Sequence, residues 1–321
     1  MSDRIRGLHH VTAISADPGE NLRFYRDFLA QRLVKVTVNF DDPFTYHFYF
    51  GDAVGTPGTI YTTFPAPGGA PGTHGVAKIA GTAFAIPTGS LAFWRTRAES
   101  FGYAQTTRAA RFGEDAITVI DPDGAVIELV ESDAPPPDPG QRWLPSGVET
   151  SNAITRILGV SVRMRDASAS AAYAEGTLGL DRVGADGPVE RLLASDGIST
   201  LDVIEDPEAP IGRFGAGIVH HVAWQTRNDA ELLAWRASVE AAGRQPTPLI
   251  DRQYFHSVYH REPGGVVYEL ATIDIGFTTD EEAESLGTAL RLPPQHEPLR
   301  AQIAASLTPI ESQGVWVPRS P

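Results

Sequence analysis

The chain has 321 residues, of which 42% are hydrophobic and 21% charged, so its length and composition fit a globular protein of about two domains. Its 40 acidic and 26 basic residues give a net charge of −14, which argues against the clustered cations of a nucleic-acid surface. The absence of cysteine excludes disulfides, thiolate metal sites and cysteine nucleophiles.

The first residues lack the apolar stretch of a secretory signal, and no run approaches the ~20 apolar residues of a membrane span. We therefore expect a cytoplasmic protein that has neither a nucleic acid nor a membrane as its partner.

The first predicted unit begins with residues 6–14, whose alternating pattern indicates a strand. Asp17 and Pro18 then open a helix with apolar positions up to Leu29. Further strands are predicted at 33–38, 45–50 and 59–64, separated by turn residues.

Residues 215–272 repeat this order, with a strand at 217–224, a helix at 228–242 and a closing hairpin at 256–272. Two weaker copies occupy 81–129 and 158–204. Each copy is too small to bury its own core. The sequence therefore predicts an α+β fold of four βαβββ modules.

A proline-rich stretch between the second and third copies, 134–140, is typical of a linker. The predicted organisation is an N-terminal domain of two modules (1–135), a linker (136–153), a C-terminal domain of two modules (154–275) and an extension (276–321). A helix is expected at 297–307, packed on the body of the protein or on a second subunit, so a homo-oligomer is compatible with the sequence.

Comparison of the modules singles out two histidine pairs and one carboxylate. The opening strand carries His9-His10 in the first module and His220-His221 in the fourth, whereas the second and third modules carry 80–82 (Ala-Gly-Thr) and 158–160 (Leu-Gly-Val) there. Glu269 lies in an otherwise apolar last strand, where an ionised carboxylate is costly unless it is paired or coordinated. The second module has Glu128 in its last strand but no histidine, so we interpret Glu128 as a surface carboxylate.

Two imidazoles and one carboxylate form the facial triad that leaves three positions of an octahedral iron open for substrate and O₂. Because side chains alternate along a strand, we expect only one histidine of each pair to face the cavity. The remaining histidines lack comparable support from the repeat: His47, His74, His256, His260 and His296.

The chain resembles the vicinal oxygen chelate superfamily, which has the fold of glyoxalases, bleomycin-resistance proteins and extradiol dioxygenases. Residues 7–12 (Gly-Leu-His-His-Val-Thr), 37–43 (Thr-Val-Asn-Phe-Asp-Asp-Pro) and 51–59 are similar to the hydroquinone 1,2-dioxygenase branch. The resemblance implies Fe(II), with Mn(II) as an alternative, bound by His10, His221 and Glu269. It also implies a small aromatic substrate, O₂ as co-substrate, and catalytic roles for four further residues: His9, His220, Arg252 and Tyr259.

Other interpretations remain open. A glyoxalase-like isomerase or lyase would need a second carboxylate, but the strand at 59–64 has neither Asp nor Glu. A metal-free binding protein of the bleomycin-resistance type would not need the His-His-Glu set. Arg252 and Tyr259 could instead be an ordinary ion-pair former and a hairpin aromatic. Catechol-type cleavage would take a histidine from the third module, where 158–160 has none.

Overall fold

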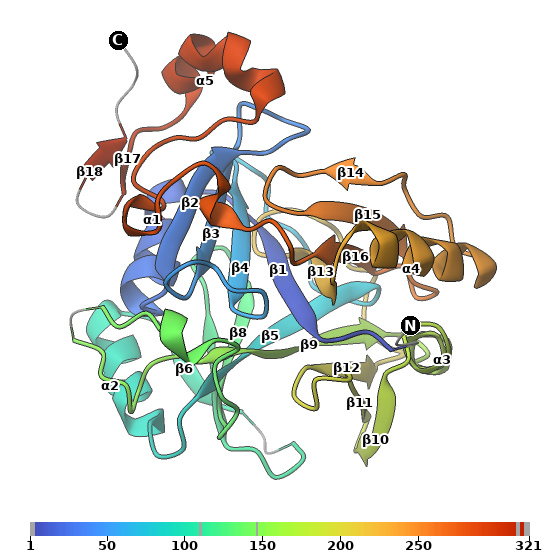
Figure 1. Ribbon diagram of the computed structural model, residues 1–321. Coiled ribbons are helices and arrows are strands. Elements are labelled where there is room, and N and C mark those ends of the chain that lie inside the picture. The colour runs from blue at the N-terminus through green and yellow to red at the C-terminus, as the bar shows by residue number, and fades with distance from the viewer. Residues whose placement is uncertain (1–3, 109–110, 146, 313–314, 318–321) are drawn as a thin grey trace.

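The computed structural model describes residues 4–108, 111–145, 147–312 and 315–317. Within them, four modules follow one another along the chain, each with a strand, a helix and three further strands (Figure 1). Their strands join into one open mixed sheet of 16 strands. The predicted α+β fold of four βαβββ modules is confirmed.

The first module comprises β1 (Leu8–Ser15), α1 (Pro18–Leu22), a π-helical segment (Arg23–Phe28), β2 (Arg32–Val38), β3 (Tyr46–Gly51) and β4 (Ile60–Pro65). Asp17 begins the helix, because its Oδ1 accepts a hydrogen bond from the Glu20 N–H at 2.8 Å. The helix then widens, as shown by the 2.9 Å hydrogen bond that the Leu29 N–H donates to the Phe24 carbonyl.

The other modules have the same plan. The second comprises β5 (Lys78–Ile86), α2 (Leu91–Phe101), β6 (Gln105–Thr107), β7 (Ala116–Ile120) and β8 (Val126–Glu131). The third comprises β9 (Arg156–Met164), α3 (Ser168–Gly176), β10 (Asp181–Asp186), β11 (Val189–Leu193) and β12 (Thr200–Glu205). The fourth comprises β13 (Val219–Thr226), α4 (Asp229–Ala241), β14 (Ile250–Asp251), β15 (His256–Arg261) and β16 (Val267–Thr272).

Strand pairing joins modules from opposite halves of the chain. β1 pairs antiparallel with β13, and β5 pairs antiparallel with β9, so the first module joins the fourth and the second joins the third. One residue pair, Val219 and Ile79, connects the two interfaces. The division into domains at 1–135 and 154–275 stays a prediction. The predicted linker, 136–153, carries one 3-10 turn (Pro139–Gln141) and packs on the body, where the Trp94 Nε1–H donates to the Asn152 carbonyl at 2.9 Å.

The hydrophobic core lies between the sheet and the helices that cover it. Its largest fully buried side chains include Trp94 of α2 and Trp224 of β13. β1 is buried along almost its whole length, because it lies between β13 and β4 in the middle of the sheet. Polar side chains on this strand are therefore held away from bulk water.

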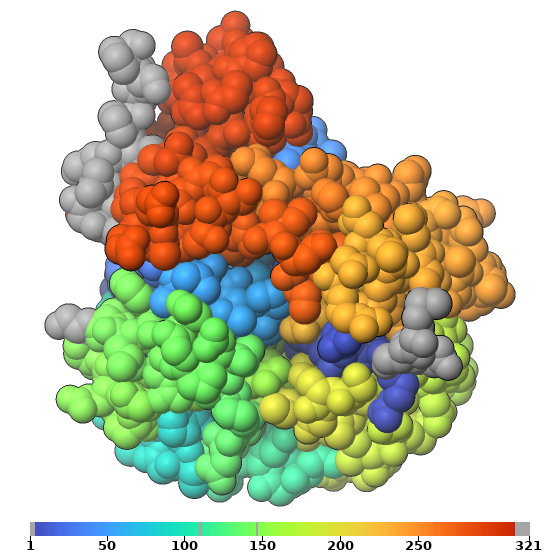
Figure 2. Space-filling view, in the orientation of Figure 1, coloured from blue at the N-terminus to red at the C-terminus, as the bar shows by residue number. Residues whose placement is uncertain are grey.

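The C-terminal segment packs on the first module. Lys35 of β2 is fully buried and pairs with Asp280 at 2.6 Å, and the Tyr46 hydroxyl donates to the Thr308 carbonyl at 2.9 Å. The space-filling view shows this orange and red segment forming the top of the molecule (Figure 2). The sequence predicted that the helix in this segment packs on the body of the protein or on a second subunit. The structure shows the segment packed on the body.

The helix expected at 297–307 is present in part as α5 (Arg300–Ser306). It follows a 3-10 segment (Pro294–Leu299), because Pro298 has no N–H to donate to an α-helical hydrogen bond. The extension also contains 3-10 turns at Phe277–Thr279 and Ala283–Ser285, and the short strands β17 (Ile310–Ser312) and β18 (Val315–Val317). No helix in the described part of the chain is long and apolar enough to cross a lipid bilayer.

Candidate metal centre

The first histidine pair lies at a β-bulge in the central strand β1. Leu8 pairs with Trp224 and His10 pairs with Ala223, so His9 is an extra residue that has no partner on β13. A bulge of this kind bends the strand and changes the direction of the side chains around it.

The second histidine pair lies at a matching bulge in β13. Thr12 pairs with His221 and Ala13 pairs with Val219, which leaves His220 as the extra residue. In both pairs, the first histidine is the bulged residue and the second takes part in the regular ladder.

The bulges bring the two rings of each pair into contact. The Nδ1 atoms of His9 and His10 are 2.9 Å apart, and those of His220 and His221 are 2.8 Å apart. The expectation that only one histidine of each pair faces the cavity holds for His10, but it is wrong for the second pair, because both His220 and His221 line the cavity.

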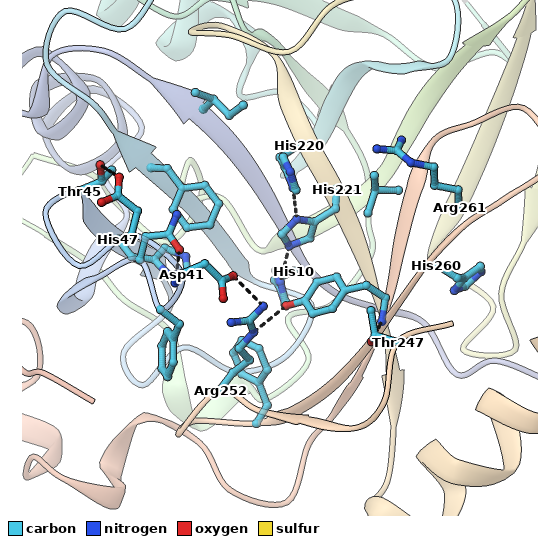
Figure 3. Close-up of a pocket in the computed structure, with 18 of the residues that line it drawn as sticks. His10, Asp41, Thr45, His47, His220, His221, Thr247, Arg252, His260 and Arg261 are labelled. Carbon is cyan, nitrogen blue, oxygen red and sulfur yellow. Dashed lines mark hydrogen bonds and ion pairs between the residues drawn. The ribbon is translucent and has the colours of Figure 1, made fainter. Parts of the chain in front are cut away.

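Three donor atoms converge between β1, β13 and β16. Oε2 of Glu269 lies 3.1 Å from Nε2 of His10 and 2.9 Å from Nε2 of His221, and the two Nε2 atoms are 3.3 Å apart. All three side chains are buried. Figure 3 shows His221 between His220 and His10, with the contacts drawn as dashed lines.

The hydrogen-bond network assigns the tautomer of His10. Burial lowers the pKa of His9 to about 3, so His9 is neutral. His9 can then donate only from Nε2, to the Thr272 carbonyl at 3.1 Å, and its Nδ1 accepts the Nδ1–H of His10. The Nε2 lone pair of His10 is thereby directed at Glu269 and His221.

His220 stands in the same relation to His221. Burial lowers the pKa of His220 to about 3 and also lowers the pKa of His221, so both rings are neutral. The contact between their Nδ1 atoms lets His221 donate to His220, which leaves the Nε2 lone pair of His221 free.

The residues fit a divalent metal. Oε1 of Glu269 accepts a hydrogen bond from the Ser257 hydroxyl, whereas the buried Oε2 forms no hydrogen bond of acceptable geometry within the described chain. Two nitrogen lone pairs and one anionic oxygen facing a single point favour a cation between them, and this donor set suits iron or a similar metal.

A cavity of about 890 Å³ opens onto two of the three donor residues, His10 and His221. The first module forms one wall and the fourth module the other, with five large aromatic side chains in the lining: Phe40, Tyr49, Phe64, Phe255 and Tyr259. A cavity with apolar aromatic walls and a few polar groups at its base is the usual form of a small-molecule site.

Arg252 and Tyr259, for which the family resemblance implies catalytic roles, also line this cavity, and those roles stay a prediction. Arg252 donates from Nε to the Tyr259 hydroxyl at 3.2 Å and from Nη2 to Asp41 at 3.2 Å. Burial raises the pKa of Tyr259 far above its ordinary value, so the hydroxyl stays protonated and its hydrogen is available to another acceptor.

His47 is a cavity residue that the sequence did not single out. It is buried, its Nε2 lies 2.9 Å from Oγ1 of Thr62, and its ring packs against Tyr49 and Phe64. Alternation along β3 places His47 and Tyr49 on one face, and Tyr49 has the same register to β4 as Tyr259 has to β16. Tyr49 and Tyr259 therefore occupy equivalent positions in the first and fourth modules. This repeated tyrosine was the sequence signal that could have identified this face of β3, and His47 with it.

The other histidines lie away from the three donors. His74 and His296 contact backbone carbonyls, His256 pairs with Asp229, and His260 forms a 2.8 Å hydrogen bond with the Tyr173 hydroxyl.

The interpretation of Glu128 as a surface carboxylate is wrong. Its side chain is only 11% exposed and binds Arg108 at 2.9 Å and Arg111 at 2.6 Å. The sequence could not show this, because the arginines lie 20 and 17 residues away along the chain and reach Glu128 only through the fold.

Comparison with known proteins places this geometry in context. No family model matches the chain. It is 40% identical to MhqO of Bacillus subtilis, which is named a ring-cleaving dioxygenase, over 97% of this chain and 98% of the relative. It is 41% identical to MhqE of the same organism, which has the same designation, over 94% of this chain and 97% of the relative. It is 30% identical to the chlorohydroquinone/hydroquinone 1,2-dioxygenase of Sphingobium indicum, over 96% and 97% of the two chains.

Solved structures agree with the fold. A crystal structure described as that of a dioxygenase from Bacillus subtilis superposes with a TM-score of 0.92 at 39% identity, covering 97% of this chain and 99% of that one. Glyoxalase I from Zea mays superposes with a TM-score of 0.61 at 16% identity, covering 83% and 92%, which shows a shared fold alone.

Proposed function

The chain belongs to the ring-cleaving dioxygenases of the vicinal oxygen chelate superfamily, and from this premise we propose that it uses Fe(II) and O₂ to open hydroquinone-like aromatic diols. The observation that carries the proposal is the convergence of His10, His221 and Glu269 at the base of an aromatic-lined cavity. Mn(II) is the alternative metal, since the same donors accept it.

His10, His221 and Glu269 would hold the metal as three protein ligands. When bound, the metal supplies a positive charge that favours the deprotonated form of a phenol and open positions for small ligands. His9 and His220 keep the two ligand imidazoles in the tautomer with a free Nε2 lone pair. This role is more specific than the general catalytic one predicted for these two residues.

Arg252 and Tyr259 would act on the substrate itself. The Tyr259 hydroxyl already accepts a hydrogen bond from Arg252, so its own hydrogen can be donated to an oxygen of the substrate. The Arg252 guanidinium adds a fixed positive charge beside that oxygen. Together they would stabilise an oxyanion and hold one proton at the Tyr259 Oη, available for transfer.

The cavity walls would orient the ring. Phe40, Phe64 and Phe255 line the cavity with apolar rings against which an aromatic substrate would pack. Because these residues come from the first and fourth modules, the ring would lie across the interface that also forms the metal site.

The proposal is tested with an oxygen electrode. Anaerobically prepared enzyme loaded with Fe(II) should consume one O₂ per ring opened when given hydroquinone, methylhydroquinone or chlorohydroquinone, and the product should be a ring-opened unsaturated acid with near-ultraviolet absorbance. Catechol should react more slowly, because the third module has no histidine at 158–160. Peroxide should inactivate the enzyme, and Fe(II) with ascorbate should restore it.

Two outcomes would overturn the proposal in favour of its rivals. Absence of oxygen uptake with every para-diol, combined with hemithioacetal isomerisation by a nickel-loaded sample, would indicate a glyoxalase-like enzyme. Failure of the anaerobic protein to bind any divalent metal would indicate a binding protein of the bleomycin-resistance type.

A further inference from the structure

The cavity beside the candidate metal centre is larger than one aromatic ring requires. Its volume of about 890 Å³ lies near the upper end of the roughly 300–1,000 Å³ of pockets that enclose drug-sized molecules. A hydroquinone has one six-membered ring and two hydroxyls, so it would fill only part of this space. The cavity can therefore hold a substituent on the ring as well, and the charges around it bear on the chemistry of that substituent.

The side of the cavity near Arg252 carries acidic groups. Asp41 and Asp42 both line it. Asp41 pairs with Arg252 at 3.2 Å, and Asp42 accepts a hydrogen bond from the Thr45 hydroxyl at 2.6 Å. Two carboxylates against one guanidinium leave an excess of negative charge here, which disfavours an anionic substituent on this side.

Arg261 lies on the opposite side of the cavity, where Figure 3 shows its side chain extending toward His220. On β15 it follows Tyr259 by two residues, and Tyr259 pairs with Glu269. Side chains two residues apart lie on the same face of a strand, about 7 Å apart along it. Arg261 therefore shares a face with Tyr259 and Glu269. A ring bound beside Tyr259 would need a substituent only a few atoms long to reach Arg261.

Lys78 of β5 adds a second positive charge on this side. Its Nζ lies 4.3 Å from the centroid of the Phe214 ring, and that ring packs against His220 of the cavity lining, with centroids 5.0 Å apart. Lys78 is buried, and burial together with the charge of Arg261 lowers its pKa. The second effect arises because the two cations lie near each other.

Within the described chain, neither cation forms an ion pair with a carboxylate. Arg261 donates from Nη1 to the Gly265 carbonyl at 2.8 Å, and Lys78 donates from Nζ to the Ala77 carbonyl at 3.0 Å. Both acceptors are neutral, and each accounts for one of the several donors of its side chain. The result is a local excess of positive charge beside the cavity, in a chain with a net charge of −14.

We propose that Arg261 and Lys78 form an anion subsite on this side of the cavity, and that the substrate is a para-diol with a carboxylate or similar anionic group on a short side chain. The inference rests on the proposed ring-opening function and narrows its substrate class. Arg261 would bind the anion directly, because a guanidinium can pair with a carboxylate through two parallel hydrogen bonds. Lys78 would add a second positive charge nearby. Repulsion by Asp41 and Asp42 would favour this orientation of the substrate over the reverse one.

The direct test compares three probes of similar shape under anaerobic conditions, so that binding is measured without turnover. The probe 3-(2,5-dihydroxyphenyl)propanoate is an anion, its amide is neutral, and 3-(2,5-dihydroxyphenyl)propylamine is a cation. Calorimetry on the Fe(II)-loaded protein should show the acid bound about tenfold more tightly than the amide, because hydrogen bonds between charged groups are stronger than neutral ones. The amine should bind more weakly than the amide, and added salt should reduce the preference for the acid.

Variants assign this preference to the two cations. Arg261→Gln should reduce the preference for the acid over the amide to about twofold or less, and Lys78→Gln should reduce it to about threefold, because each removes one positive charge. Arg261→Glu should bind the amine more tightly than the acid. Such a reversal requires a folded protein with an intact cavity.

Arg165→Gln is the matched control. It removes another exposed guanidinium that donates to backbone carbonyls, those of Pro207 and Ala209, but that does not line the cavity. It should keep the full preference for the acid.

Equal affinity of the unchanged protein for the acid and the amide would overturn the inference. A preference that survives in Arg261→Gln or in Lys78→Gln would do the same, as would an equal loss in Arg165→Gln, which would indicate general attraction by net charge. Failure of the proposed function has a different pattern: no oxygen uptake with any diol, while the preference for the acid and its loss in Arg261→Gln persist. Oxygen uptake with hydroquinone, combined with equal binding of acid and amide, would remove the subsite alone.

Discussion

At the scale of single residues, the two adjacent imidazoles of each histidine pair have different roles. The bulged ring accepts a hydrogen bond at Nδ1, and the next ring presents a lone pair at Nε2. Neither ring could do both, because a neutral imidazole has one donor and one acceptor nitrogen. The doubled histidine in the sequence is thus a ligand together with the group that orients it.

This division predicts different effects for the two members of a pair. His10→Ala, His221→Ala and Glu269→Ala should each weaken Fe(II) binding by about 100-fold or more, because each removes a ligand. His9→Leu and His220→Leu should weaken it by only about 10- to 100-fold, and should retain metal at saturating Fe(II), because the ligand remains but its tautomer is no longer fixed. Metal content after anaerobic loading and desalting measures the difference.

His74→Ala is the matched control, since this exposed histidine contacts only the Gly124 carbonyl among its described neighbours. It should bind metal normally. Loss of metal in His9→Leu with retention in His10→Ala would mean that the bulged residues are the ligands.

Part of the site was predictable from the sequence at this scale. The repeat identified the two histidine pairs and Glu269, because the other modules lack the full set. The family resemblance then implied the second histidine of each pair, His10 and His221, as the ligands. The bulges were not predictable, since a bulge is defined by the register of a partner strand more than 200 residues away along the chain. Without it, the contact of both rings and the exposure of His220 to the cavity could not be derived.

At the scale of elements, the protein contains two interfaces of the same kind, each between the opening strands of two modules. The two interfaces carry different side chains. Where β1 meets β13, histidines and one carboxylate form a candidate metal site. Where β5 meets β9, glycines replace the histidines, and guanidinium groups balance Glu128 and Asp202. The sequence predicted the strands of both interfaces well, since hydrophobic alternation is local, but not the ion-pair cluster.

This cluster predicts a stability effect that is independent of the metal. Glu128→Ala should lower the free energy of unfolding by about 3 kcal/mol, because it leaves Arg108 and Arg111 buried with fewer counter-charges. Fe(II) affinity should not change, since Glu128 lies at the other interface. Denaturant unfolding of the metal-free protein measures the first quantity, and chelator competition the second.

The exposed Glu208→Ala provides the comparison, and should alter the unfolding free energy by less than about 0.5 kcal/mol. Equal stability of Glu128→Ala and Glu208→Ala would show that the buried cluster contributes nothing net to folding.

At the scale of the whole molecule, both interfaces join the two halves of the chain. β1 and β5 belong to residues 1–135, and their antiparallel partners β13 and β9 belong to residues 154–275. The sequence predicted that the metal would lie between the first and fourth modules, because the histidines occur there. It could not predict that the second and third modules pair with each other, since no residue pattern distinguishes this pairing from one within each half. Assembly into a homo-oligomer remains a prediction.

Because each interface joins strands from both halves of the chain, the final prediction concerns assembly of the candidate metal site. Residues 1–140 contain His10, and residues 145–321 contain His221 and Glu269, so neither fragment alone has all three ligands. Each fragment alone would also leave the edges of its central strands unpaired. Neither should therefore bind Fe(II) tightly, whereas the two fragments expressed together should associate and bind one Fe(II) per pair. Co-purification through a tag on one fragment, followed by metal analysis, tests this.

Two outcomes would contradict the prediction. Tight stoichiometric binding by 145–321 alone would place the whole site in the C-terminal half. Co-expressed fragments that associate but bind no metal would show that the ligands do not meet across β1 and β13.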